Sequence, residues 1–146
     1  MALLVFIVLV AAAALTGAQF EPGAWYSQLA KPAWTPPDEL FAPVWSALYL
    51  AIALAGWRVW RVARGLPASL QLWGVQLVLN MLWSWLFFGL HRPRLALLDI
   101  VLLLLSIVAF IATAQRHSIV ASWLFVPYMA WVAFATALNV AIVRLN

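Results

Sequence analysis

The chain has 146 residues, of which 68% are hydrophobic and only 8% are charged. One domain of this length cannot hide so much apolar surface from water, so the composition excludes a soluble globular protein and predicts one that lipid covers. The net charge of +4 does not indicate a nucleic-acid binder, because the arginines stand at the ends of apolar runs, and the absence of cysteine excludes disulfide and thiol chemistry.

Five apolar runs are long enough to cross a bilayer, which takes about 20 residues each. We predict helices over residues 2–20, 41–62, 67–90, 94–115 and 119–144. The links RGLP, HRPR and QRHS between the last four runs are very short, so neighbouring helices must be antiparallel. The sequence therefore predicts an all-α fold, an integral membrane bundle of five transmembrane helices in one domain, residues 1–146.

The first run, MALLVFIVLVAAAALTGAQ, has two interpretations. Thr16 and Ala18 are small residues of the kind that precede a signal-peptide cleavage site. However, no basic residue precedes the apolar core, and the run is long enough to span. We predict that it is retained as a helix, with signal-peptide cleavage as the alternative.

The connection between the first two runs, residues 21–40, is called the cap below. Its prolines prevent a continuous helix, because they lack a donor N–H and push the preceding residue out of the helical region. Its aromatic side chains carry too much apolar surface for a disordered segment. They include Trp25, Tyr26 and Trp34. We predict a structured loop that lays these rings over the mouth of the bundle.

The third run places Gln76, Asn80 and Ser84 four residues apart, on one face of a helix. Polar side chains at this depth are costly unless they point into the protein. Bonds to neighbouring helices are the simplest role for Gln76 and Ser84. Asn80 lies one turn from Trp83 and is equally suited to contact a ligand.

Asp99 is the only acidic residue inside a predicted span. A charge at this depth is expensive and marks a candidate functional site. An ion pair with Arg94 or Arg92, protonation to the neutral acid, and contact with a ligand are all consistent with its position.

The fifth run places Trp131, Ala135 and Asn139 four residues apart, one turn after Tyr128. Stripes of alanine on the second and fifth runs permit close helix approach, either within the protomer or in a dimer. They are Ala47, Ala51 and Ala55, and Ala133, Ala137 and Ala141.

The ten tryptophans divide by depth. Those near the ends of runs suit the interfacial belt of membrane proteins, namely Trp57, Trp60, Trp73 and Trp123. Trp45, Trp83 and Trp131 lie deeper or share a face with polar residues, where a flat apolar ligand could stack on them. No catalytic triad, phosphate loop or metal-ligand spacing is present, and we predict no metal site and no obligatory cofactor.

Four motifs resemble, in the same order, those of the TspO/MBR family of tryptophan-rich sensory proteins, translocator proteins and peripheral-type benzodiazepine receptors. They are W-Y-x-x-L-x-K-P-x-W-T-P-P at Trp25–Pro37, F-x-P-V-W ending at Trp45, N-x-x-W-x-x-x-F at Asn80–Phe87, and P-Y-x-x-W-x-x-F-A-x-x-L-N at Pro127–Asn139, with Asp99 matching between the last two. The resemblance covers nearly the whole chain.

The resemblance implies five transmembrane helices, a homodimer in a bacterial membrane, and a pocket beneath the loop between the first two helices. It implies as ligand a porphyrin such as protoporphyrin IX or a haem-like tetrapyrrole, with synthetic isoquinoline carboxamides and benzodiazepines also bound in the family. Carried over by motif, the pocket residues are Tyr26, Trp34, Trp45, Asn80, Trp83, Asp99, Trp131, Ala135 and Asn139.

Three functions follow as expectations: a porphyrin-binding protein with a sensory or transport role, an enzyme that degrades porphyrin in light through Trp45 and Trp131, and a membrane scaffold without a small ligand. We expect binding without catalysis. Some family members bind sterol, but Val140 stands where the animal motif has a tyrosine before Arg144, which puts sterol binding in doubt. The basic cluster of Arg58, Arg61 and Arg64 favours a cytoplasmic N-terminus and an outward-facing cap.

Overall fold

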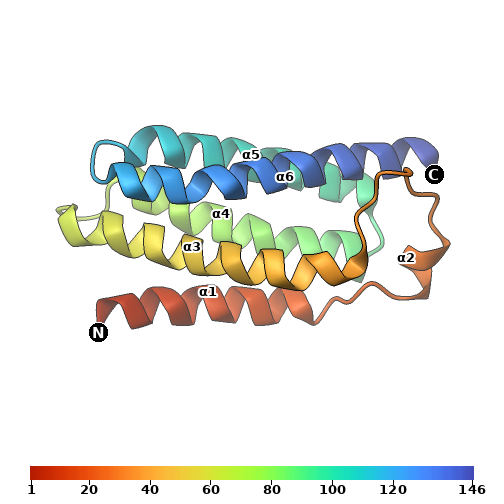
Figure 1. Ribbon diagram of the computed structural model, residues 1–146, viewed down its shortest axis with the longest axis horizontal. Helices are drawn as coiled ribbons and strands as arrows, with labels where there is room; N and C mark the ends of the chain where they lie inside the picture. The colour runs from red at the N-terminus through yellow and green to blue at the C-terminus, as the bar shows by residue number, and fades with distance from the viewer.

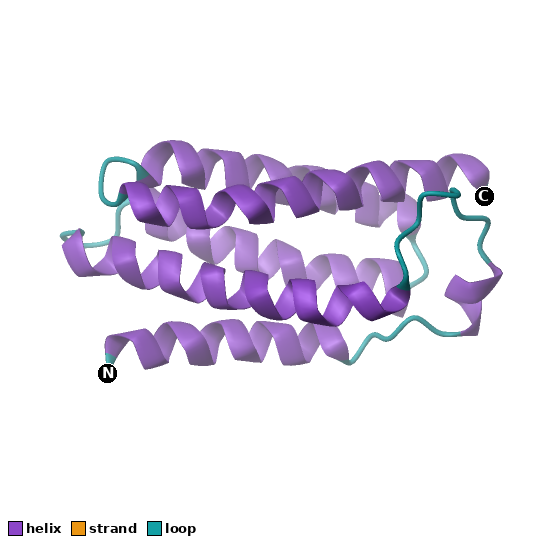
Figure 2. Ribbon diagram, in the orientation of Figure 1, coloured by secondary structure: helices purple, strands orange, loops and turns teal.

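The computed structural model describes residues 1–146. Its long helices are joined by short loops, except for the cap, which forms a long connection between the first two of them (Figures 1 and 2). Short helices, α2 and the 3₁₀ turn η1, lie within the cap. In chain order the elements are α1 (Ala2–Ala18), α2 (Ala24–Gln28), η1 (Asp38–Leu40), α3 (Phe41–Val62), α4 (Ala68–Ser84), η2 (Trp85–Gly89), α5 (Pro93–Ala114) and α6 (Ile119–Leu145).

Four helical segments are long and apolar enough to cross a membrane, and the chain is an integral membrane protein of all-helical fold. They are Asp38–Val62, Ala68–Gly89, Pro93–Ala114 and Ile119–Leu145. The first helix, α1, is also apolar but has only 17 residues. Four of the five predicted spans are therefore confirmed. The fifth, α1, is a shorter apolar helix, and its crossing of the membrane stays a prediction.

The helices run side by side along the long axis of the molecule (Figure 1). α1 lies against α3 and α4, α5 packs between α4 and α6, and α6 returns to contact α3. The N-terminus lies at one end of the bundle, whereas the C-terminus and α2 lie at the other end (Figure 1). That end, which the cap covers, is called the cap end below.

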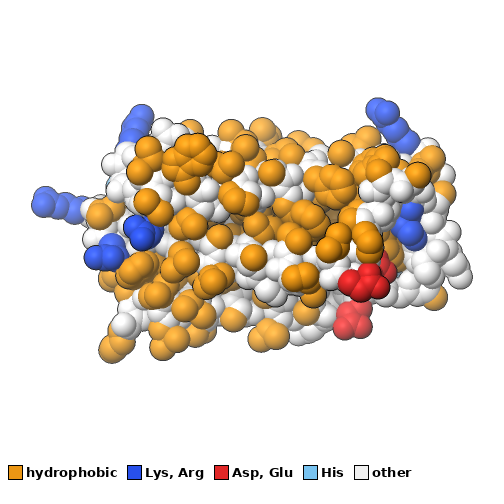
Figure 3. All heavy atoms as spheres, in the orientation of Figure 1, with side chains coloured by type: hydrophobic (Ala, Val, Ile, Leu, Met, Phe, Trp, Pro, Cys, Tyr) orange, Lys and Arg blue, Asp and Glu red, His pale blue; other side chains and the backbone are white.

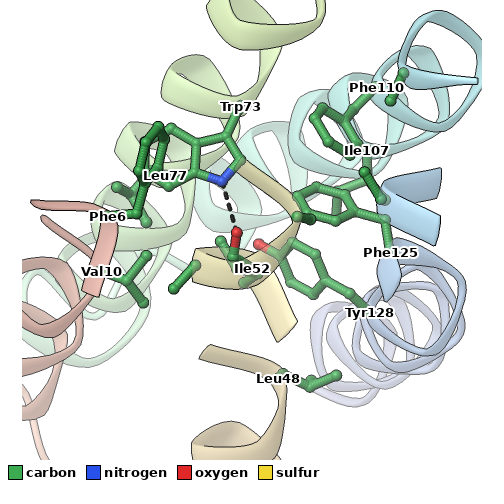
Figure 4. Packing of buried hydrophobic residues seen from close by; sticks show 14 of the residues in the cluster. Phe6, Val10, Leu48, Ile52, Trp73, Leu77, Ile107, Phe110, Phe125 and Tyr128 are labelled. Carbon is green, nitrogen blue, oxygen red and sulfur yellow. Dashed lines mark hydrogen bonds between the residues drawn. The ribbon is translucent and has the colours of Figure 1, made fainter. Parts of the chain in front are cut away.

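The half of the bundle away from the cap is closely packed (Figure 4). The Trp73 ring meets Phe6 edge-on with 5.0 Å between centroids, and its indole N–H donates to the carbonyl oxygen of Ile52 at 2.8 Å. Gly56 makes this possible, because a Cβ there would lie 2.5 Å from the Trp73 indole nitrogen.

Trp73 was predicted to belong to the interfacial belt, and that prediction is wrong. Its side chain is buried, and its N–H is satisfied by a backbone carbonyl inside the protein rather than by headgroups or water. Trp60 and Trp123 are exposed, as belt residues should be. Trp57 is half-buried, with the Arg61 guanidinium 4.8 Å from its ring centroid.

The alanine stripes have different surroundings. On α3, Ala55 is fully buried, so this stripe packs within the protomer over part of its length. On α6, Ala133 and Ala137 are exposed. On α3, Ala47 is also exposed, so both stripes present small side chains outward over part of their length, where lipid or a second copy could cover them.

Candidate functional site

The cap end contains a cavity of about 590 Å³. Side chains from the cap and from α1, α3, α4, α5 and α6 line it, and most of them are apolar. A volume in this range is typical of sites that hold a drug-sized or cofactor-sized molecule. Seven of the nine predicted site residues line it: Tyr26, Trp45, Asn80, Trp83, Trp131, Ala135 and Asn139.

Three tryptophans, each from a different helix, form the aromatic walls. On α3, Trp45 stacks on Tyr49 with 5.3 Å between centroids. On α6, the Trp131 ring meets Phe41 edge-on at 5.7 Å. Neither Trp45 nor Trp131 donates its indole N–H to another group of the chain, because the only indole donors are Trp73 and Trp83. These two N–H groups have no hydrogen-bond partner within the chain.

The third wall is held in place by an amide. The Trp83 indole N–H donates to Oδ1 of Asn139 at 3.1 Å, and Nδ2 of Asn139 donates to the carbonyl oxygen of Pro93 at 2.9 Å. Asn139 thus joins α4, α5 and α6. Asn139 lines the cavity, as the motif predicted, and its hydrogen bond fixes the orientation of the Trp83 ring.

A buried chain of hydrogen bonds, the polar floor, lies at the deep end of the cavity. Tyr128 donates its hydroxyl to Oε1 of Gln76 and accepts from Nδ2 of Asn80, both at 2.9 Å. Tyr49 approaches Oδ1 of Asn80 at 3.4 Å. Gln76 takes the interhelical role predicted for it. Asn80 belongs both to the polar floor and to the cavity lining, because its side chain bonds to Tyr128 and also borders the cavity.

Tyr49 is one of the lining residues that sequence reasoning missed, and it brings a polar group to the cavity. It follows Trp45 by four residues on α3, so the two rings share a helix face. That spacing was available in the sequence as a signal. Its hydroxyl brings a second phenol to the polar floor, opposite Tyr128.

A π-helical turn, η2, ends the predicted third run. Single π-turns are frequent at functional sites because they re-aim the side chains that follow. Here the turn places Phe87 and Phe88 between α4 and the cap, where both rings meet Tyr26 edge-on. Phe87 also stacks on Trp83 at 5.0 Å. The turn therefore connects the cavity wall to the cap.

The cap is folded onto the bundle, as the sequence predicted. Tyr26 is buried, and the Lys31 ammonium donates to the Tyr26 carbonyl oxygen at 2.6 Å while lying 4.4 Å from its ring centroid. The Asn146 side chain exchanges two hydrogen bonds with the backbone of Ala30, at 3.0 and 2.9 Å. The end of α6 thus holds the cap from the opposite side.

Trp34 does not line the cavity. It lies outside α6, where its ring meets Phe134 edge-on at 5.7 Å and remains 49% exposed. There it borders a shallow groove together with Val140 and Arg144. The cap brings Tyr26 to the site but carries Trp34 past it to the outer surface of α6.

Asp99 also does not line the cavity, although its neighbour Ile100 does. The side chain is 4% exposed, and both carboxyl oxygens are buried without a hydrogen-bond partner. The ion pair with Arg94 or Arg92, one of the predicted alternatives, is therefore absent. An unpartnered carboxyl at this depth is costly as an anion, which favours the neutral acid among the alternatives.

Comparison with known proteins identifies relatives along the whole chain. The model of the TspO/MBR family matches residues 2–145. Protein CrtK of Rhodobacter capsulatus is 42% identical, covering 97% of this chain and 91% of its own length. The tryptophan-rich protein TspO of Chlorobaculum tepidum is also 42% identical, covering 86% and 82%. The human translocator protein is 36% identical, covering 84% of this chain and 75% of its own length.

Proposed function

This chain belongs to the TspO/MBR family, and from that premise we propose that it binds flat apolar ligands of the tetrapyrrole class, such as protoporphyrin IX, in the cavity beneath the cap. The observation that carries the proposal is the cavity of about 590 Å³, walled by Trp45, Trp83 and Trp131. Each aromatic pair between ligand and wall adds about 0.5–1.5 kcal/mol beyond burial of area. A sensory or transport role would follow from ligand-dependent contacts of the cap.

The site suits an apolar disc with a few polar groups. The walls are aromatic, whereas the polar floor offers a tyrosine hydroxyl and an amide from Tyr49 and Asn80. Trp45 and Trp131, which also line the cavity, have indole N–H groups that bond to no other group of the chain and could serve as donors. Few polar groups in an otherwise apolar cavity fix the orientation of a ligand while area burial supplies affinity.

The proposal includes α1 as a fifth span. At about 1.5 Å per residue, its 17 residues reach about 25 Å, close to the hydrocarbon thickness of a bilayer. Phe6, Val10 and Ala13 are buried against the bundle, and Gly17 lines the cavity. Removal of α1 as a signal peptide would strip a wall from the site, which supports its retention.

Titration of the purified protein with protoporphyrin IX in the dark tests the proposal, with tryptophan fluorescence as the readout. Saturable quenching is expected. Ala135→Leu should lower the affinity at least about tenfold, because Ala135 lines the cavity and the added carbons occupy space the ligand needs. The control is Ala133→Leu on the same helix, which faces outward and should bind as the unmodified protein does.

Substitutions of Trp131 separate a cavity wall from a belt residue. Trp131→Phe keeps an apolar ring and should weaken binding less than Trp131→Ala. Trp123→Ala, at an exposed belt position, should leave affinity unchanged. Unchanged binding by both Ala135→Leu and Trp131→Ala would overturn the proposed site, and a scaffold without a small ligand would then be the better reading.

The same titration under illumination examines the enzymatic alternative. Its supporting observation is that Trp45 and Trp131 both border the cavity with unused indole N–H groups. Loss of porphyrin in light that disappears with Trp131→Ala would favour degradation. Binding without any light-dependent product would favour the binder.

We also propose a homodimer, which the exposed alanines of α6 support. Ala137→Leu should weaken a dimer formed through α6, whereas Ala51→Leu tests α3. The oligomeric state in detergent and in bilayers is the readout. If neither variant changes the oligomeric state, the alanine stripes serve only helix packing within the protomer.

A further inference from the structure

The mouth of the cavity differs in charge from its walls. Exposed lining residues define the mouth, and all of them lie between the end of α1 and the start of α3: Ala18, Glu21, Pro22, Asp38 and Ala42. Two of these five are acidic, and no lysine, arginine or histidine lines any part of the cavity. In the space-filling view, acidic side chains gather at this end of the bundle (Figure 3).

The basic residues of the cap end do not line the cavity. The Lys31 ammonium donates to the Tyr26 carbonyl oxygen and lies 4.4 Å from the centroid of the Tyr26 ring, whereas Arg144 borders the outer groove of α6. Arg92 and Arg94 are exposed at the start of α5 and do not line the cavity. None of them forms an ion pair or a side-chain hydrogen bond with Glu21 or Asp38, so no basic side chain offsets the two carboxyl groups at the mouth.

The field of Asp38 reaches the cavity wall. Tyr26 belongs to the cap, outside the spanning helices, and lines the cavity. Burial raises the pKa of its phenol, and the negative charge of Asp38 raises it further. A second anion placed near Tyr26 would experience the same repulsion, because the low-dielectric rim focuses the potential of charges at its edge.

We propose that Glu21 and Asp38 act as a charge filter, so that the cavity favours flat apolar ligands whose polar edge is neutral or cationic over ligands that carry carboxylates. The inference rests on the proposed binding function and refines its ligand class. Protoporphyrin IX carries two propionate carboxylates, so the filter weakens its binding relative to that of its diester without abolishing it. A disc that enters apolar side first leaves its polar edge at the mouth. Carboxylates there face two acidic groups, and no cationic side chain lines the cavity to offset them, whereas an ammonium group gains two partners.

The test uses three derivatives of one porphyrin macrocycle: the dicarboxylic acid, its dimethyl ester, and a diamide with terminal amines. Dissociation constants are measured at low salt for the unmodified protein, for Glu21→Gln and for Asp38→Asn. Each substitution should tighten the dicarboxylic acid about 2- to 5-fold, weaken the diamine by a similar factor and leave the ester unchanged, as expected for exposed charges. High salt should reduce these differences.

Glu39→Gln is the matched control. Glu39 is the next residue after Asp38 in η1 and is equally exposed, but it does not line the cavity. It should change none of the three affinities by as much as Asp38→Asn does.

Ratios of affinity between the derivatives separate the filter from general effects on folding, because a folding defect weakens all three alike. If all three bind but Glu21→Gln and Asp38→Asn leave the ratios unchanged, the filter is wrong and the proposed binding function stands. An effect of Glu39→Gln equal to that of Asp38→Asn would also overturn it, in favour of diffuse surface charge. If no derivative binds saturably to any variant, the binding function fails and the filter fails with it.

Discussion

The two halves of the bundle use the same residue types in opposite ways. Away from the cap, aromatic rings fill space: Phe110 and Phe125 lie 3.9 Å apart between centroids, and both are fully buried. At the cap end, aromatic rings surround space: Trp45, Trp83 and Trp131 border a cavity of about 590 Å³. The polar floor lies between the two halves and belongs to both, because Tyr128 packs on Phe125 and bonds to Asn80.

The difference shows how an apolar chain keeps a cavity open. In the packed half, small residues such as Gly56 and Ala55 let helices approach until rings interlock. In the cap half, a hydrogen bond to Asn139 holds the Trp83 ring, whereas Trp45 and Trp131 are held by ring contacts with Tyr49 and Phe41, and these interactions oppose inward collapse. Hydrogen bonds and ring stacking thus replace close packing where the protein leaves room for a ligand.

The largest effect is expected from removing a ring in each half. Phe125→Ala should destabilise the protein by about 3–5 kcal/mol, because it leaves a void among fully buried rings. Phe88→Ala should cost clearly less, since Phe88 is half-buried and already borders the cavity. Unfolding in detergent measures both. Equal losses of stability would contradict the contrast between a filled and an open half.

Adding one methyl group to the packed half is the next test. Gly56→Ala should cost about 1–3 kcal/mol of stability, because the new Cβ collides with the Trp73 ring and with Phe6. Gly74→Ala is the matched control on α4, where a Cβ meets nothing within 4 Å. It should be neutral or stabilising by up to about 1 kcal/mol, through helix propensity. A similar shift in unfolding temperature for both variants would mean that the Gly56 contact does not limit packing.

Removal of one hydroxyl tests the boundary between the halves. Tyr128→Phe should cost about 1–3 kcal/mol, because Gln76 and Asn80 each lose a buried partner. Tyr49→Phe removes only the longer 3.4 Å contact and should cost less. Denaturant unfolding compares the two. A larger loss of stability for Tyr49→Phe than for Tyr128→Phe would mean that the Tyr128 hydroxyl is not the main contributor to the polar floor.

The smallest effect is expected at the cap. Asn146→Ala removes both side-chain bonds to Ala30, which are exposed, so the unfolding temperature of the bundle should change little. The cap itself should open more often, and limited proteolysis within residues 21–40 should become faster. Proteolysis at an unchanged rate would show that Lys31 and the buried Tyr26 are enough to hold the cap.

Local properties of the sequence are enough to predict the helices and most of the site. Hydropathy placed α3 at residues 41–62 because the length of an apolar run is a local property, and the motif spacing placed Trp131, Ala135 and Asn139 on one face. The same spacing grouped Gln76 with Asn80, which the polar floor joins through Tyr128.

Which side of each helix faces the core and which faces lipid is set by tertiary packing. In a membrane protein the side chains that face lipid and those that face the core are both apolar, so hydropathy does not fix the rotation of a helix about its axis. The position of Trp73 near the end of a run therefore predicted a belt residue, but its side chain points inward and bonds to Ile52. Trp34 was predicted to line the cavity, but it lies on the outer surface of α6. Asp99 forms no ion pair with Arg92 or Arg94. Its surroundings depend on how α5 packs against α4 and α6, and not on the residues near it in the sequence.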